Sequence, residues 1–243
     1  MRKTGTASAP NDLNVWQERS VGFYGADGGG LSSIVKYDIG ALADLAYGGV
    51  FVLALIPESV GVFGGLVGLR DGLNTKFGFS LTLGNTENLL FTVGSNSFNC
   101  PLRVPLNRWV SLYAQKASGA SIARTAMSDG AAWQLANTIS LLNNNAVALT
   151  EITIGSAVLS QIASFSFVGN IAAVAIFKNR VLSDATIQTL HTKAGLVASA
   201  PDAYWLLNNI SPEAPIPELV AGIVQTARQV TGIGAPVPKS WVA

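Results

Sequence analysis

The sequence predicts an all-β protein, a sandwich or barrel of antiparallel strands with one short covering helix. Short apolar or alternating runs recur roughly every ten residues between turn residues, a spacing typical of sandwiches and barrels. One late segment, residues 169–195, joins a strand to a capped helix. The length of 243 residues suits one large β domain or two small ones.

The strand in this late segment is apolar on both faces. One face carries Ile171, Ala173, Ala175 and Phe177, and the other carries Ala172, Val174 and Ile176. Successive side chains of a strand point to opposite faces, so the pattern predicts burial on both sides. A solvated corner, residues 178–180, then leads to a single helix. We expect the helix to begin after Ser183 and to end near Gly195, with Ile187 and Leu190 against the sheet.

Other runs are expected to be strands: residues 75–84, 107–119, 150–156, 203–209 and, after a turn at 85–88, residues 89–94. An Asp129-Gly130 turn predicts a hairpin after the second of them. Residues 94–101, rich in Asn and Ser, are expected to form a loop. The residues predicted in or beside the core are Val174, Ile176, Phe177, Leu112, Leu81 and Trp109.

Residues 47–69 carry a single charge and resemble a membrane span at first sight. Pro57 and several glycines interrupt them, whereas a spanning helix needs about twenty continuous apolar residues. We therefore expect a buried strand over residues 50–56 and no membrane span. Arg2 and Lys3 are not followed by an apolar stretch, so we expect synthesis in the cytoplasm without a secretion signal.

Composition excludes several classes of function. The net charge is +1 and the basic residues are scattered, whereas nucleic-acid binding needs a basic stripe. Cys100 is the only cysteine and is expected to be a small core residue. His191 is the only histidine, which excludes a multi-histidine metal site and predicts a partly exposed helix residue.

The order of these segments resembles the laminin-G-like branch of the concanavalin A-like lectins and glucanases. That branch has a tryptophan-led strand, an Asp-Gly hairpin, an Ile-Gly strand and a "G-x-I-x-x-V-x-I-[YF]-x-R-x-L-S" block. The matching positions are Trp109, Asp129, Gly130, Ile154, Gly155, Gly169, Ile171, Val174, Ile176, Phe177, Arg180, Leu182, Ser183 and Ile187. The resemblance covers about residues 45–210 and implies a jelly roll of two antiparallel sheets with a capping helix.

The departures from this family concern metals and catalysis. Calcium-binding members use clustered acidic groups, but the Asp and Glu residues of this chain are scattered. Asp129 could ligate Ca²⁺, although an isolated turn aspartate usually supports its own turn, so no cofactor is predicted. The Glu-x-Asp-x-Glu triplet of the related glucanases is missing. We therefore expect no catalytic residues and no enzyme activity.

A glycan-binding site is the commonest task of the family. Sugars offer C–H faces and hydroxyls, which aromatic rings and Asn, Asp and Gly loops recognise. Trp133, beside Asp129 at the hairpin tip, is the best candidate, with Asn143, Asn144 and Asn145 on a loop expected nearby. The alternative is that Trp133 is a core residue at the rim of the sandwich.

Three segments are expected: an N-terminal arm (1–18), the jelly roll (19–210) and a proline-containing C-terminal arm (211–243). The C-terminal arm could contain a helix after Pro217. An apolar strip and a terminal tryptophan would then dock on a neighbouring subunit through Leu219, Ile223, Val230 and Trp241. The alternative is a terminal strand or arm that packs on its own domain.

Three functions follow. Low charge and long terminal segments favour a structural or decorating component of a virus or bacteriophage particle, located in the virion and involved in surface or host attachment. Its partners would be other copies of itself, other particle proteins and glycans. The alternative is a free glycan-binding lectin module, and a glycoside hydrolase is the least supported.

Overall fold

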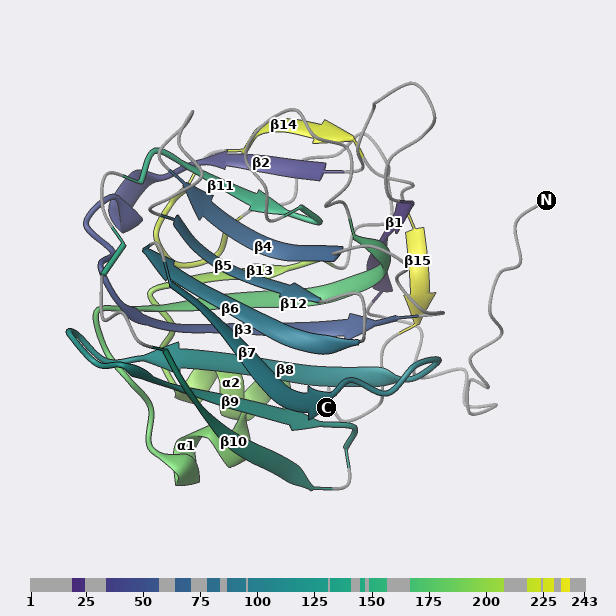
Figure 1. Ribbon diagram of the computed structural model, residues 1–243. Coiled ribbons are helices and arrows are strands. Elements are labelled where there is room, and N and C mark those ends of the chain that lie inside the picture. Colours follow the sequence, from purple (N-terminus) through teal and green to yellow (C-terminus); the bar gives the residue numbers. More distant parts are fainter. Residues whose placement is uncertain are drawn as a thin grey trace.

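The computed structural model describes the strands and helices of the domain. The described residues are 19–24, 34–56, 64–70, 78–83, 87–94, 96–130, 132–140, 145–146, 149–156, 167–207, 218–223, 225–229 and 233–236. Within them, two antiparallel sheets stack face to face as a jelly-roll sandwich (Figure 1). No described helix is long and apolar enough to cross a membrane.

The first sheet has eight described strands in the order β10-β9-β8-β3-β12-β1-β15, and β13 pairs with β12 beside β1. Its strands are β1 (Arg19–Tyr24), β3 (Gly48–Leu55), β8 (Trp109–Lys116), β9 (Ile122–Ser128), β10 (Trp133–Ile139), β12 (Val168–Lys178), β13 (Ala203–Leu206) and β15 (Ile233–Pro236).

The second sheet has seven described strands in the order β14-β2-β11-β4-β5-β6-β7. Its strands are β2 (Ile34–Asp38), β4 (Gly64–Arg70), β5 (Gly78–Leu83), β6 (Asn88–Gly94), β7 (Asn96–Arg103), β11 (Glu151–Ile154) and β14 (Gln225–Gln229). A short 3₁₀ turn, η2 (Gly40–Leu42), follows β2.

The main core lies between the two sheets and is built by alternation along each strand. Val110, Leu112 and Ala114 of β8 point into it, whereas Trp109 and Tyr113 of the same strand belong to the opposite face. Val174, Ile176 and Leu81, which were predicted for the core, are fully buried there. The prediction for these core residues is confirmed.

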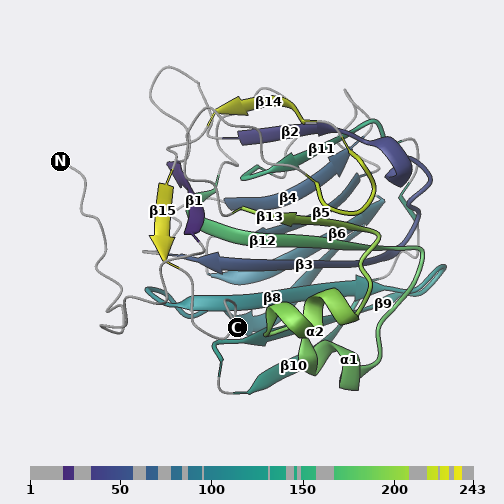
Figure 2. The ribbon, with the colours of Figure 1, turned by 180° about the vertical axis from the view of Figure 1, so that it is seen from behind.

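A second apolar layer lies on the outer face of the first sheet, beneath two short helices, α1 (Asp184–Thr189) and α2 (Lys193–Ala198). Figure 2 shows both helices covering this face. Ile187, Leu190 and Leu196 pack there with Phe177 and Phe51. The two-sided burial predicted for β12 is therefore confirmed, because one face meets the second sheet and the other meets the helices.

The expectation of a single helix is wrong. Ser183 caps α1 as predicted, since its Oγ accepts the Thr186 N–H at 3.2 Å. Thr192 then begins α2, because its Oγ1 accepts the Gly195 N–H at 3.0 Å. A Cβ on Gly195 would lie 2.0 Å from the Thr189 carbonyl oxygen, so Gly195 permits the tight packing of α2 on α1 rather than ending a helix.

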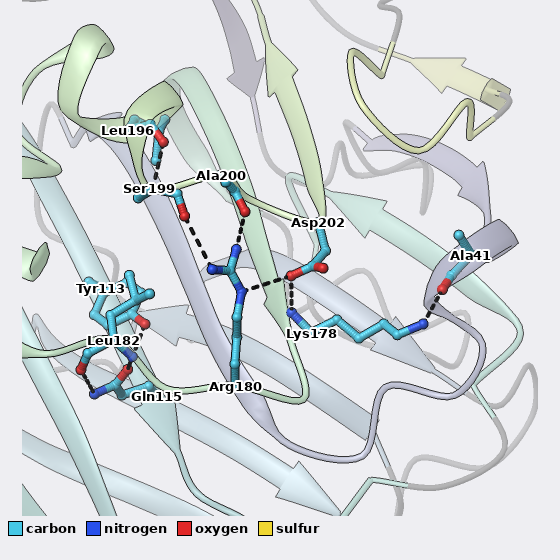
Figure 3. A network of polar contacts seen from close by, with 10 residues as sticks. All are labelled: Ala41, Tyr113, Gln115, Lys178, Arg180, Leu182, Leu196, Ser199, Ala200 and Asp202. Carbon is cyan, nitrogen blue, oxygen red and sulfur yellow. Dashed lines mark hydrogen bonds and ion pairs between the residues drawn. The ribbon is translucent and has the colours of Figure 1, made fainter.

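The corner after β12 is half-buried and bonded, not solvated as expected (Figure 3). Arg180 donates from Nε to Asp202 at 3.2 Å and from Nη1 to the Ser199 carbonyl at 3.2 Å. Nearby, the Gln115 side chain holds both the N–H and the carbonyl of Leu182. These bonds fix the two helices to the strands that they cover.

The C-terminal helix expected after Pro217 is also wrong. Glu218 bridges to Trp205 of β13, and residues 225–229 form β14, which pairs with β2. The segment 233–236, β15, pairs with β1, so these residues add strands to both sheets. Open strand edges here offer backbone hydrogen bonds, which override weak helix propensity.

The four residues expected to dock on a neighbouring subunit therefore do not share one exposed strip. Ile223 is 6% exposed and packs in the chain's own core, whereas Leu219 is 52% exposed. The remaining two, Val230 and Trp241, lie outside the described residues, as does the predicted arm 1–18. Ile223 is thus not available to a neighbouring subunit.

Candidate ligand-binding surfaces

Trp133 and Asp129 lie close together, as predicted, at one end of the first sheet. Trp133 pairs with Ser128, the residue before Asp129, across the β9–β10 hairpin. The Trp133 indole N–H donates to the Gln188 carbonyl at 3.0 Å, and Asp129 forms an ion pair with Arg108 at 2.9 Å. The half-buried Trp133 ring packs against the outer apolar layer, so both side chains have structural partners within the domain.

Asn145 lies at the other end of the same strands. Its Oδ1 accepts from Lys116 Nζ and from the Gly119 N–H, each at 3.3 Å, in the turn between β8 and β9. Asp129 follows β9, so the length of a strand separates it from Asn145. The expectation that these residues lie close together is wrong, and Asn143 and Asn144 lie outside the described residues.

The Lys116 ammonium is unusually buried for a lysine, with the residue only 1% exposed, and burial lowers its pKa. Between this lowered pKa and the ordinary value of 10.5, the unfolded chain binds more protons than the native chain. The free energy of unfolding should therefore rise with pH in that window. Urea unfolding of wild type and Lys116→Met at several alkaline pH values tests this. Equal pH slopes for the two proteins would contradict it.

The other two residues singled out by type have structural surroundings. Cys100 is buried, with its Sγ 2.6 Å from the Thr125 hydroxyl, which confirms its expected place in the core. His191 is half-exposed, and its Nδ1 lies 2.6 Å from the Gln188 carbonyl. Among the described residues, no group of three His, Cys, Asp or Glu side chains could hold a metal ion.

A polar surface on the outer face of the second sheet was not among the sites predicted from the sequence. This face is toward the viewer in Figure 1, and the described helices α1 and α2 lie on the far side of the sandwich. The inward side chains of β6 and β7, such as Phe91 and Phe98, are in the core, so their neighbours point outward. We call six of the outward side chains the β6–β7 surface: Asn88, Leu90 and Thr92 of β6, Ser97 and Asn99 of β7, and Ser80 of β5, which is opposite Thr92.

The β6–β7 surface places polar pairs on either side of a half-exposed leucine. Thr92 pairs with Ser97 across the strands, with the two hydroxyl oxygens 3.2 Å apart. Asn88 donates from Nδ2 to Asn99 Oδ1. Leu90 lies between these pairs on β6 and is directly opposite Asn99. The surface thus offers an apolar centre with neutral donors and acceptors around it.

The surface was missed because residues 94–101 were expected to form a loop. They belong instead mainly to β7, in which Phe98 and Cys100 alternate with the exposed Ser97 and Asn99. Asn and Ser favour loops, but pairing with β6 and burial of the two apolar side chains override that preference. The alternation itself was the signal that could have revealed the strand.

One ion pair lies at the edge of this surface. Arg103 is opposite Asn88 on β7, and its Nε lies 3.7 Å from the carboxylate of Glu87. The Arg103 side chain is 75% exposed and that of Glu87 is 15% exposed. The six side chains of the surface itself are uncharged.

No protein-family model matches the sequence, and a search of curated proteins finds no match. Solved structures do match in fold. A heptameric SAP-like pentraxin from Limulus polyphemus matches with 14% identity over 92% of this chain and 98% of its own, with a TM-score of 0.55. A proposed carbohydrate binding protein from Bacteroides ovatus matches with 10% identity over 91% of this chain and 61% of its own, with a TM-score of 0.58.

A third match is the CBM40 module of a Ruminococcus gnavus IT-sialidase, bound to α2,3 sialyllactose. It has 12% identity over 70% of this chain and 95% of its own, with a TM-score of 0.50. At such identities the likeness concerns the fold alone. The chain has the concanavalin A-like jelly-roll fold, as the resemblance of its late strand-and-helix block predicts.

Proposed function

We propose that this protein is a carbohydrate-binding module whose ligand lies on the β6–β7 surface. The observation that carries the proposal is the half-exposed Leu90 between two neutral polar pairs, Asn88–Asn99 and Thr92–Ser97. A sugar ring presents C–H groups to an apolar side chain and hydroxyls to amides and hydroxyls. The carbohydrate-binding structures among the fold neighbours support carbohydrate binding by this chain.

The test is glycan binding by variants of this surface. We expect Asn99→Ala and Leu90→Ala each to weaken binding about tenfold, since a lost hydrogen bond or apolar contact of about 1.4 kcal/mol has that effect. Affinities for glycans selected on an array would be measured by calorimetry. Circular dichroism would establish that the variants remain folded.

Trp133 provides the matched control on the opposite sheet. Trp133→Phe keeps an aromatic ring but removes the indole N–H that bonds Gln188. Under our proposal this variant binds glycans like the wild type. Weakened binding by Trp133→Phe, with normal binding by the two β6–β7 variants, would contradict the proposal and indicate a glycan site at the β9–β10 hairpin instead.

The role in a virus or phage particle stays a prediction, as do virion location, self-association and lack of catalysis. A glycan-binding surface would suit host attachment by such a particle. The C-terminal residues 225–229 and 233–236 pair within the domain as the end strands of the two sheets.

A further inference from the structure

Building on the proposed function, we propose that the β6–β7 surface selects neutral glycans over acidic ones, and that Glu87 enforces this selection. The six side chains of the surface are hydroxyls, amides and one leucine, all uncharged at neutral pH. They can donate to and accept from the hydroxyls of a neutral sugar. They carry no charge to compensate a carboxylate or sulfate that loses its water on binding.

The basic residue beside this surface, Arg103, has an acidic partner. Arg103 lies opposite Asn88, at one end of the surface, and Glu87 directly precedes Asn88. The Val104 N–H donates to the Glu87 carbonyl at 2.8 Å, which holds the two ends of β6 and β7 together. An acidic sugar that approached Arg103 would therefore also meet the Glu87 carboxylate at 3.7 Å from the guanidinium.

Among the described residues, the next basic residues on this sheet are Arg70, which ends β4 two strands from β6 and is opposite Glu151 of β11, and Lys36. A lateral row joins Thr92, Ser80, Gly68, Thr153 and Lys36 through successive strand pairs. Lys36 is on β2, four strands from β6, or about 19 Å at the usual strand spacing. This distance exceeds the screening length of about 8 Å in physiological salt.

The experiment compares matched glycans on the full-length protein. Each neutral oligosaccharide is printed beside its α2,3-sialylated, α2,6-sialylated and sulfated forms. We expect the wild type to bind the neutral form at least tenfold more tightly than each acidic form. Equal or tighter binding of the acidic forms would overturn the selection while leaving glycan binding in place. Binding of no glycan at all would overturn the proposed function as well.

A charge variant tests the role of Glu87. Glu87→Gln keeps the shape of the side chain but removes the negative charge beside Arg103. We expect it to bind acidic glycans at least fivefold more tightly than the wild type does, with neutral glycans changed less than twofold. The gain should disappear in about 0.5 M salt, because it is electrostatic.

Arg103→Gln is the matched control, since it removes the cation and leaves the Glu87 carboxylate without this partner, so it should bind acidic glycans more weakly than the wild type does. If folded Glu87→Gln shows no gain, Glu87 does not enforce the selection. If Glu87→Gln does not fold, the comparison of Arg103→Gln with the wild type decides. Unchanged or tighter binding of acidic glycans by Arg103→Gln would then overturn the role of the ion pair, and weaker binding would support it.

Discussion

Replacing Gly48 with alanine is expected to prevent the sandwich from folding. Gly48 begins β3 with a φ of +128°, a region that residues with a side chain rarely adopt. A Cβ there would lie 2.0 Å from the carbonyl oxygen of Phe177 in β12. Backbone strain of about 1–3 kcal/mol adds to this collision. The sum should exceed about 4 kcal/mol, a large part of the stability of a typical domain.

The collision partner is backbone, so no side chain can move aside. β3 would have to separate from β12, and these two strands are the centre of the first sheet. We expect Gly48→Ala to accumulate as aggregate, and any material recovered to lack a cooperative urea transition. A cooperative transition with a loss below about 2 kcal/mol would show that β3 can shift, contrary to this expectation.

Gly119→Ala is the control for backbone strain alone. Gly119 also has a positive φ, +61°, but a Cβ there would have no atom within 4 Å. A left-handed conformation costs an ordinary residue roughly 1–2 kcal/mol. This variant should therefore fold, with a free energy of unfolding reduced by about that amount.

Glu218→Ala is expected to lower the free energy of unfolding by about 3 kcal/mol. Glu218 is 8% exposed. Its carboxylate accepts backbone N–H groups from β13 and from the residues that directly follow Glu218. Tyr204 donates to it at 2.7 Å, Val220 at 3.0 Å and Ala221 at 2.5 Å. A buried donor left without an acceptor costs about 1–3 kcal/mol, and water can reach some of these donors in the variant.

Urea unfolding at neutral pH measures this loss. Leu219→Ala is the matched neighbour, because Leu219 is 52% exposed and its truncation should change stability by less than about 0.5 kcal/mol. The loss of stability in Glu218→Gln should lie between the losses in Glu218→Ala and Leu219→Ala, since the Gln amide keeps one acceptor oxygen. A Glu218→Ala protein as stable as Leu219→Ala would mean that the carboxylate does not hold this segment.

The sequence by itself determined the elements in which local pattern and burial agree. In β8 the aliphatic residues Val110, Leu112 and Ala114 occupy every second position. The pattern alone therefore assigns Leu112 and Tyr113 to opposite faces of the strand. β12 is apolar on both faces and is buried on both. Ser183 could be identified as a cap because the side-chain bond that it makes is local. Such features depend on residues a few positions apart, which a single sequence displays directly.

Only the tertiary structure decided which distant segments meet. Residues 96–99, three of them polar, form a strand because they pair with β6, and residues 225–229 form a strand because they pair with the edge of β2. Asn145 and Asp129 are 16 positions apart in sequence, yet they lie at opposite ends of one hairpin. Hydrogen bonding between strands pairs residues according to topology, and alternation along one strand does not reveal its partner. The β6–β7 surface exists only through that pairing.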